Sequence, residues 1–394
     1  KWKEANLPPE QAVYQCVHCG ELITEGQRQQ MLVSEIKVVP TKEFNGIAGF
    51  HVNELMSPFV TLGEMAVSFI EANKLPETLQ SWINTSLGET WEDAATVVEP
   101  EGLLVRREPY DVETIPADVC LLTIGVDTQD DRIELQLLGW GADEECWVIE
   151  HVVFRGNPGA KVIWNELTKY RMQRFVTEDG RTLLIQGTGI DSGGHYTQQV
   201  YDYCYRYRFQ RVFAVKGRGG VGQLAWPRRP GKTKLSKADV YSVGVDTIKD
   251  ILYGRIAKVA KPGPGYIHLP ASVDQEWCDQ LLSEKKIYRR TNGRKVATWR
   301  PRKIGMRQEA QDCWNYGYAV MRGRNVNLNK LFARIQKRRA ADVEEAEFQE
   351  RPVNKKRKKA KATKAEAKPE VAPKKKTAKK KRRRRAVRSN YLNK

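Results

Sequence analysis

The strongest constraint on the fold is an apolar run that ends in an acidic residue. Residues 119–127 read VCLLTIGVD, and their apolar positions follow each other almost without interruption. A continuous run of this length is typical of a strand covered on both faces of a sheet. Gly125 marks a position where backbone or a ligand approaches closely. Asp127 either caps the turn over residues 128–131 or binds a metal, because a lone buried carboxylate is costly.

The segments after this run predict how the domain is arranged. Residues 132–139 alternate polar and apolar positions and residues 145–154 supply a third strand, so the three runs form an antiparallel meander. A helix, a strand, a helix and a strand follow over 160–174, 182–191, 197–208 and 211–215. This order predicts an α/β, ribonuclease H-like fold, in which a mixed sheet of an antiparallel meander plus parallel strands is flanked by helices. Its first and fourth strands are parallel neighbours, which places Asp127 beside Asp191.

The remaining elements extend this domain to residue 325. A basic loop rich in Gly and Pro covers 217–237, and a loop of that length is mobile, functional or both. Asn292-Gly293 favours a hairpin within 288–299. Helices are expected over 238–255, 272–284 and 306–322, with a short strand over 265–269. We therefore place the main domain at 119–325.

Charge is distributed very unevenly along the chain. The 394 residues carry a formal net charge of +19, but residues 353–388 alone hold 19 basic and 2 acidic side chains. The body is therefore close to neutral, and residues 353–394 form a Lys/Arg-rich tail with too few apolar side chains to fold. We expect a disordered tail that grips DNA or RNA through its phosphates; a solubilising tail and a nuclear localisation signal are the alternatives. The candidate DNA contacts in the tail are Lys380, Arg382 and Arg383, and a charged helical connector is expected over 326–352.

The N-terminal part contains half of a zinc-binding motif. Cys16 and Cys19 flank His18 in YQCVHCGE, whereas a tetrahedral structural zinc site needs four ligands. Since the sequence has no second CxxC pair, either the missing pair lies upstream in a longer chain or the motif is not a zinc site. The first residue, Lys1, favours a fragment. We expect a partial zinc-ribbon-like segment over 1–40, which binds Zn²⁺ only if upstream ligands are present; a redox CxxC lacks its usual βαβ context.

Two further segments precede the main domain. Residues 41–92 show helical periodicity, and residues 93–118 are acidic and contain Pro, which predicts a linker. The other five cysteines stand singly among apolar residues, as is typical of a reducing compartment. No apolar run reaches the roughly 18 residues that a membrane-spanning helix needs.

Three aspartates form a candidate metal site. Asp127, Asp191 and Asp312 come from separate segments, and each lies within apolar sequence. Three converging carboxylates repel each other unless a cation joins them. Mg²⁺ or Mn²⁺ would meet that need, and two such ions about 3.5–4 Å apart can activate water and stabilise the leaving oxygen of a phosphodiester. Glu309, one helical turn before Asp312, is an alternative third ligand.

A series of short motifs lies in one order within residues 14–322. They are WINTSLGETWED (82–93), IGVDTQDDRIEL (124–135), GW (139–140), IDSGG (190–194), VKG (215–217), VGVDTIK (243–249), YIHLP (266–270) and RQEAQDC (307–313). Each is weak alone, but together they resemble the lambda-type large subunit of bacteriophage terminases, which package and cut viral DNA. The resemblance implies the end of an ATPase domain followed by a ribonuclease H-like endonuclease.

The resemblance also implies roles for individual residues. Asp127, Asp191 and Asp312 would be the metal-binding acids of an endodeoxyribonuclease that acts on double-stranded DNA. Cys16 and Cys19 would be the second half of a zinc-ribbon-like insertion. A small terminase subunit and a portal would be partners, and the cytoplasm of the bacterial host the location. ATPase activity is not expected from this chain alone, because it contains no GxxxxGK[ST] motif.

Basic and histidine side chains supply further candidates. His195 and His268 would either assist proton transfer or be hydrogen-bonded structural histidines, and the structural role is favoured. Lys216 would contact a phosphate or be a solvated loop lysine. The candidate contacts to the DNA backbone in and beside the basic loop are Lys216, Arg218, Arg228, Arg229 and Lys232.

Three functions therefore compete. The main hypothesis is a metal-dependent DNA endonuclease of a packaging terminase. The first alternative is a non-catalytic DNA-binding or assembly remnant, which would bind DNA without cutting it. The second is a stand-alone ribonuclease H-like nuclease such as a junction resolvase, which would prefer branched DNA.

Overall fold

A mixed β-sheet organises the fold. The computed structural model describes residues 8–34, 38–40, 43–46, 48–89, 91, 99–220, 222–232, 238–291 and 294–350. Among these residues the largest sheet has nine strands in the order β11-β12-β10-β9-β4-β5-β6-β13-β3. The strands are β3 (Arg107–Glu108), β4 (Leu121–Thr128), β5 (Arg132–Trp140), β6 (Cys146–Arg155), β9 (Ile185–Asp191), β10 (Val212–Arg218), β11 (Gly231–Lys232), β12 (Asp239–Gly244) and β13 (Ile267–Pro270).

The centre of the sheet has the strand order that the sequence predicts. β4, β5 and β6 form an antiparallel meander. β9 pairs in parallel with β4 on its other side, and β10 pairs in parallel with β9. Val126 lies opposite Ile190, so the next residues, Asp127 and Asp191, end neighbouring strands at one edge. The predicted mixed sheet is confirmed, and its order agrees with a ribonuclease H-like arrangement.

Helices cover both faces of this sheet. Because alternate residues of a strand point to opposite faces, a strand covered on both sides is apolar at nearly every position. Leu122, Ile124 and Val126 of β4 belong to the core on one face, and Leu121 belongs to the core on the other. The first face is covered by α5 (Lys161–Arg171) and α6 (Thr197–Arg206), and the second by α7 (Val245–Lys258), α8 (Gln275–Leu281) and α9 (Glu309–Arg324).

The contact between β4 and α9 is unusually close. A Cβ atom on Gly125 would lie 1.8 Å from the carbonyl oxygen of Cys313 and 2.5 Å from the backbone nitrogen of Gly317. Thr123 Oγ1 donates a hydrogen bond of 3.0 Å to the carbonyl oxygen of Gly317. Only glycine at position 125 permits this approach of the two backbones. It brings the first turns of α9 against the carboxyl end of β4.

The predicted helix over 238–255 is partly wrong. Residues Asp239–Gly244 form the strand β12, which pairs in parallel with β10, and only the following residues form α7. Val240 and Val243 are buried in the strand. Apolar residues in short runs fit a strand or a helix, and here pairing with β10 decides the outcome.

The linker predicted over 93–118 is also wrong for the described residues 99–118. This segment forms the short helix α4 (Glu101–Leu104) and the edge strand β3. Leu103, Tyr110 and Ile115 are buried in the core. Widely spaced apolar residues therefore fix the segment to the domain.

The N-terminal part is built from short elements. Its elements are β1 (Tyr14–Gln15), β2 (Leu22–Ile23), α1 (Glu25–Leu32), α2 (Leu62–Ala72) and α3 (Pro76–Trp82). Capping boxes at Thr24 and Thr61 begin α1 and α2. Arg255 of α7 is fully buried and forms ion pairs with Glu77 at 2.5 Å and with Glu144 at 2.6 Å. The ion pair with Glu77 fixes α3 to α7.

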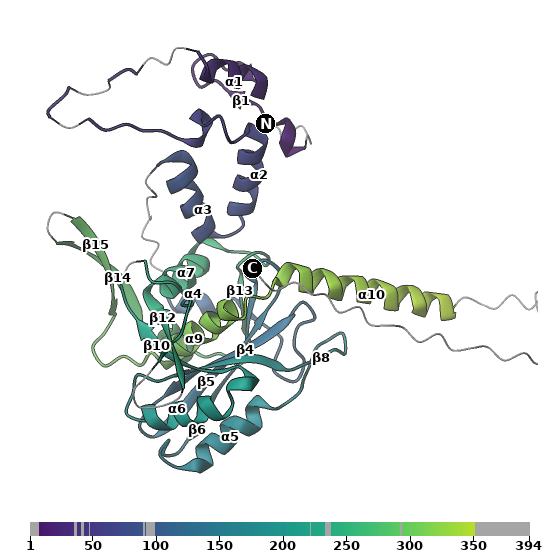
Figure 1. Cartoon of the computed structure of the whole chain (residues 1–394). Coiled ribbons are helices and arrows are strands. Elements are labelled where there is room, and N and C mark those ends of the chain that lie inside the picture. The colour runs from purple at the N-terminus through teal and green to yellow at the C-terminus, as the bar shows by residue number, and fades with distance from the viewer. Residues whose placement is uncertain are drawn as a thin grey trace, which may run out of the picture. The chain divides into compact units, whose positions relative to one another are not determined.

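The remaining elements lie outside the main sheet. β14 (Glu284–Thr291) and β15 (Arg294–Pro301) form a two-stranded ribbon that extends away from it (Figure 1), longer than the hairpin predicted over 288–299. β7 (Phe175–Val176) and β8 (Thr182–Leu183) form a second small hairpin, and α10 covers Leu328–Glu350.

The contacts between residues divide the chain into two units, 1–338 and 339–394. The second unit is described only over 339–350, where it continues α10. The predicted tail over 353–394 lies outside the described residues, and so do its candidate DNA contacts Lys380, Arg382 and Arg383. Among the described helices, none combines the length and the apolar character needed to cross a membrane.

Candidate functional site

The three aspartates predicted from the sequence lie in one pocket. It has a volume of about 420 Å³ and is formed where β4, β9 and β10 end. Asp127, Asp191 and Asp312 all contribute to its wall. The other residues that line it are Thr128, Gln129, Asp130, Gly193, Gly194, His195, Lys216, Gly217 and Tyr316.

Asp127 is the most buried of the three acids, with 5% of the residue exposed. Gln129 Nε2 donates a hydrogen bond of 2.5 Å to Asp127 Oδ2. Burial is the main cause that raises the pKa of Asp127, and the value reaches about 7. The carboxylates of Asp191 and Glu309 add to the rise, while the hydrogen bond from Gln129 opposes it. Near neutral pH this side chain therefore takes up a proton readily unless a cation stabilises its charge.

Asp191 ends β9 beside Asp127. Its Oδ2 atom accepts a hydrogen bond of 3.1 Å from the backbone N–H of Gly193. Burial raises the pKa of Asp191, although hydrogen bonds from Gly193 and from the Tyr316 hydroxyl and the charge of Lys216 lower it in part. The net effect is again a raised pKa.

Asp312 lies in the first turn of α9, where the close contact at Gly125 brings the helix to β4. Burial raises the pKa of Asp312 well above its usual range, and the Asp127 carboxylate raises it further. The Lys249 ammonium of α7 lowers it in part. In all three acids of the pocket, burial therefore favours the protonated form, and the surrounding groups offset this effect only in part.

The chemistry of this donor set suits a hard divalent cation. Carboxylate oxygens are the ligands that Mg²⁺ and Mn²⁺ prefer, and a bound cation would stabilise the ionised carboxylates that burial disfavours. In the described part of the chain, however, no three His, Cys, Asp or Glu side chains already stand in an arrangement that could hold a metal ion. The carboxyl groups would have to draw together on binding, and the two-metal site stays a prediction.

Comparison with known proteins identifies the family. The model for the endonuclease domain of the terminase large subunit gpA matches residues 47–335. That range includes the whole nine-stranded sheet and all three pocket acids. The chain belongs to this family.

Two curated relatives are terminase large subunits. That of Escherichia phage lambda is 27% identical over 299 residues, covering 73% of this chain and 46% of the relative. That of Enterobacteria phage P21 is 28% identical over 349 residues, covering 82% of this chain and 53% of the relative. The chain thus spans about half the length of the curated relatives it matches. No solved structure matches it.

Glu309, which the sequence predicts as an alternative to Asp312 for the third ligand, is held by two arginines. Arg132 Nη2 donates a hydrogen bond of 2.5 Å to Glu309 Oε1, and Arg307 Nε donates one of 3.3 Å to Oε2. Glu309 is nevertheless close enough to Asp127 for its charge to raise the pKa of that residue. Asp312 lines the pocket, whereas Glu309 lies beside it in an ion-pair network.

The sequence reasoning missed Glu134, the central acid of this network. Glu134 lies opposite Asp127 on β5 and is fully buried. It forms ion pairs with Arg132 at 2.5 Å, Arg307 at 2.6 Å and His151 at 3.3 Å. Burial alone would raise the pKa of Glu134, but the neighbouring His151 imidazole and the hydrogen bond from Arg132 lower it to about 2. The alternation of β5 suggests a solvated position, and only the covering of this face by α9 reveals the burial.

Of the candidate DNA contacts that are described, one lies in the pocket wall. Lys216 lines the pocket and is exposed, beside Asp191. Within the described part of the basic loop, Trp226 stacks on Tyr241 of β12 with ring centroids 4.5 Å apart, which anchors this part of the loop to the sheet. The other candidates are exposed but are not part of the pocket wall: Arg218, Arg228, Arg229 and Lys232.

The two candidate histidines have different surroundings. His195 is exposed at the rim of the pocket. Its Nδ1 atom lies 2.7 Å from Asp130 Oδ1, and this contact raises the pKa of His195.

His268 is buried, stacks on Trp147 with ring centroids 4.5 Å apart, and contacts Glu108 and Glu145. It is not part of the pocket, and its contacts are those of a structural histidine.

Cys16 and Cys19 lie in a small turn between β1 and β2. The backbone N–H of Gly20 donates a hydrogen bond to the carbonyl oxygen of Cys16, and Gly20 has the positive φ of 76° that such a turn requires. Hydrogen bonds from backbone groups of Cys19 and His18 lower the pKa of the Cys16 thiol. This favours the thiolate form that binds metal, but two cysteines are half of a zinc site.

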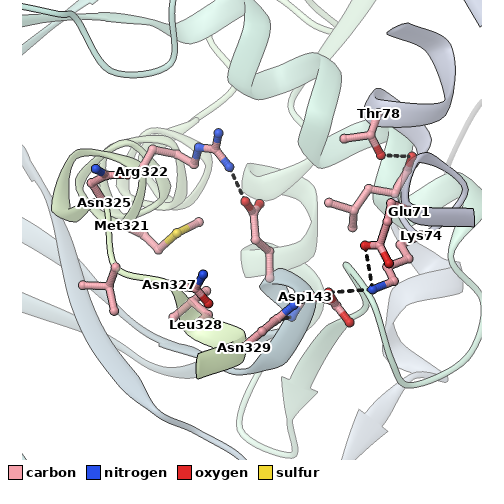
Figure 2. Close-up of a pocket in the computed structure, with 13 residues that line it drawn as sticks. Glu71, Lys74, Thr78, Asp143, Met321, Arg322, Asn325, Asn327, Leu328 and Asn329 are labelled. Atoms are coloured by element: carbon pink, nitrogen blue, oxygen red, sulfur yellow. Dashed lines mark hydrogen bonds and ion pairs between the residues drawn. The ribbon is translucent and has the colours of Figure 1, made fainter. Parts of the chain in front are cut away.

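A second pocket lies between α2–α3 and the C-terminal end of α9 (Figure 2). Its volume is about 350 Å³. Its charges pair with one another: Lys74 contacts Glu71 at 2.9 Å and Asp143 at 3.5 Å. Arg322 pairs with Glu144. The charged side chains that line this pocket thus pair with one another, and the pocket lies where these elements of the fold meet.

Proposed function

We propose that this chain is the nuclease portion of a phage DNA-packaging terminase large subunit and cuts double-stranded DNA by metal-dependent hydrolysis. The observation that supports this most directly is the convergence of three carboxyl groups with raised pKa values in one pocket. The pocket lies within the range that matches the family's endonuclease domain. Buried acids that serve only the fold are expected to have cationic partners, as Glu134 does.

In this proposal Asp127, Asp191 and one acid of α9, Asp312 or Glu309, hold two Mg²⁺ or Mn²⁺ ions. When bound, such ions activate water and stabilise the leaving oxygen of a phosphodiester. The side chain of Gln129 orients the Asp127 carboxylate, and the Tyr316 hydroxyl orients that of Asp191.

Lys216 has a separate role. Its exposed ammonium at the pocket wall provides a positive charge for a phosphate of the DNA backbone. This contact between Lys216 and a phosphate does not depend on a bound metal ion. Lys216 is therefore expected to strengthen DNA binding whether or not the ions are present.

The family also supports wider proposals for the whole protein. A small terminase subunit and a portal are its proposed partners, and the cytoplasm of the bacterial host is the place of action. ATP hydrolysis is assigned to a part of the terminase outside this sequence, because the chain has no P-loop motif. Cys16 and Cys19 are proposed as half of a zinc site whose other ligands come from upstream sequence.

Cleavage of supercoiled plasmid DNA tests the proposed function. We expect the full chain to nick or linearise plasmid in Mg²⁺ or Mn²⁺ and to leave it intact in EDTA. Asp127→Asn should reduce cleavage by more than about 100-fold, since loss of a direct ligand should cost more than the 10–100-fold typical of groups that merely support a ligand. The variant should keep the circular dichroism spectrum of the wild type.

Asp130→Asn is the matched control, because Asp130 lines the same pocket but is exposed and contacts His195. It should cut within a few-fold of wild type. Equal cutting by wild type and Asp127→Asn would refute the site. DNA binding without cleavage in any divalent metal would favour the non-catalytic alternative, and a strong preference for branched DNA would favour a resolvase.

A further inference from the structure

The β14–β15 ribbon concentrates positive charge in one place. Residues 284–303 contain nine basic side chains and a single acidic one, Glu284. Outside this segment and the basic stretch over 353–388, the chain has an excess of acidic residues. None of the DNA contacts predicted from the sequence lies in the ribbon.

Like charges face each other directly on the ribbon. Lys285 pairs in register with Arg300, and both residues are exposed. Neither has an ion-pair partner among the residues that the structure describes, and Lys303 just beyond β15 is exposed as well. Like charges directly opposite each other destabilise a strand pair. The repulsion between Lys285 and Arg300 destabilises the free protein, but it is relieved when an anionic partner binds to both side chains.

The base of the ribbon is fixed beside the acidic pocket. The Tyr253 hydroxyl of α7 lies 2.8 Å from the carbonyl oxygen of Glu284, the first residue of β14. The same hydroxyl accepts a hydrogen bond of 2.9 Å from Gln311 of α9, next to Asp312. Glu284 also forms an ion pair with Lys249, and both charges act on Asp312. The ribbon is thus connected to the pocket through α7 and α9.

The opposite side of the ribbon is occupied by the protein. Trp299 Nε1 donates a hydrogen bond of 3.1 Å to Asp250, and Lys286 forms an ion pair of 2.9 Å with the same carboxylate. The Trp299 ring lies 4.5 Å from that of Tyr253. Since residues of a strand alternate between faces, these contacts leave the face with Lys285 and Arg300 free for a partner.

We propose that the β14–β15 ribbon is a DNA-positioning element, which contacts the phosphate backbone of double-stranded DNA through Lys285 and Arg300 and guides the duplex to the acidic pocket. Each strand has 8 residues, so the ribbon is roughly 26 Å long. A two-stranded ribbon fits the major groove of B-form DNA. This inference rests on the proposed function, because it names the element that holds the substrate of that same site.

Salt-dependent DNA binding tests the ribbon without any cleavage. The affinity of the full chain for a short blunt-ended duplex is measured by fluorescence anisotropy in EDTA over a range of salt concentrations. Lys285→Ala/Arg300→Ala should weaken binding about tenfold at low salt and reduce the slope of log K against log[salt] by about 2, one for each lost phosphate contact. The tail over 353–394 is present in every variant, so a difference in affinity or in salt slope between variants comes from the substitutions in the ribbon.

Lys169→Ala/Arg174→Ala is the matched control, since both side chains are exposed in and beyond α5, on the other face of the sheet. This control should bind as the wild type does. A second variant, Lys285→Gln/Arg300→Gln, keeps polar side chains on the ribbon and should show the same loss. Wild-type affinity and slope in both ribbon variants would overturn the proposal and point to an acidic protein partner instead. Because binding is measured in EDTA, failure of cleavage and failure of the ribbon are separate results.

Discussion

Two groups of buried acids lie next to each other at one edge of the sheet, and the pKa values of one acid from each group, Asp127 and Glu134, move in opposite directions. Asp127 and Glu134 face each other across β4 and β5, and both are almost inaccessible to solvent. The pKa of Asp127 is raised to about 7, whereas that of Glu134 is lowered to about 2. Burial raises the pKa of both residues, so burial does not distinguish them.

The difference lies in their partners. Glu134 contacts two guanidinium groups and an imidazole, while Asp127 is contacted by an amide and repelled by neighbouring carboxylates. We call Glu134 and Glu309, with Arg132 and Arg307, the paired group, and Asp127, Asp191 and Asp312 the unpaired group. A buried charge that no protein group balances destabilises the fold, and such a charge is typical of a functional site, where a bound ion or ligand balances it. The comparison therefore supports the proposed metal-binding role of the unpaired group and favours a structural role for the paired group.

The largest expected effect concerns the two acids of α9, which the comparison places in different groups. Asp312→Asn should reduce metal-dependent plasmid cleavage by more than about 100-fold, as expected for a direct ligand. Glu309→Gln should retain more activity, because Glu309 is neutralised by Arg132 and Arg307. Cleavage rates of the two purified variants, measured side by side in Mn²⁺, decide between them.

The reverse order would break the comparison. A larger loss in Glu309→Gln than in Asp312→Asn would move Glu309 into the metal site. Arg132 would then have to release Glu309 when the ions bind. Cleavage is measured for each variant over a range of Mn²⁺ concentrations. Loss of a metal ligand raises the Mn²⁺ concentration that cleavage requires, whereas loss of folded protein lowers the rate at every Mn²⁺ concentration.

Part of this site could be predicted from the sequence. The continuous apolar run before Asp127 indicated a strand buried on both faces, and the order of elements placed Asp191 beside it, as the pairing of β4 with β9 confirms. The flanking helix of Asp312 indicated burial, and Gly125 indicated a close approach, which the contact with Cys313 and Gly317 provides. These features depend on local pattern and on strand order, which a sequence carries.

The features that were missed depend on contacts between distant segments. Glu134 occupies a polar position of an alternating strand, and only α9, far along the chain, buries it and brings Arg307 to it. Residues 239–244 fit a helix by their apolar spacing and become a strand because β10 offers a partner. The acidic residues and Pro of the segment 93–118 predict a linker, yet Leu103 and Ile115 are buried there. Pairing and burial of this kind are not encoded locally.

The second effect is on stability and concerns the paired group. Glu134→Gln removes the charge that Arg132 and Arg307 share. Breaking a buried ion pair typically costs about 3–5 kcal/mol, and we expect about 3 kcal/mol here because both arginines keep other acidic partners. Urea unfolding at neutral pH measures the loss. Asp130→Asn, at an exposed position in the pocket, should change the free energy of unfolding by less than about 0.5 kcal/mol. A Glu134→Gln variant as stable as wild type would show that the network does not stabilise the fold.

The smallest effect is the pH dependence of stability in metal-free protein, and its sign differs between the two groups. The folded-state pKa of Asp127, about 7, lies above its ordinary value of 3.8, so stability falls as pH rises between these values. Asp127→Asn cannot ionise and should be more stable than wild type by about 2 kcal/mol at pH 8 in EDTA, with no advantage near pH 4. Saturating Mg²⁺ should remove the advantage at pH 8, because the cation stabilises the wild-type carboxylate.

Glu134 should behave in the opposite way. Its folded-state pKa of about 2 lies below its ordinary value of 4.5, so its contribution to stability is present above pH 4.5 and is lost as pH falls towards 2. The cost of Glu134→Gln should therefore be largest at neutral pH and shrink in acid, while the benefit of Asp127→Asn grows with pH. Urea unfolding of both variants in EDTA across this range gives two difference curves. Curves of the same slope would mean that the charges of Asp127 and Glu134 are balanced by their neighbours to the same extent. The assignment of the unpaired group as the metal site would then lose its support.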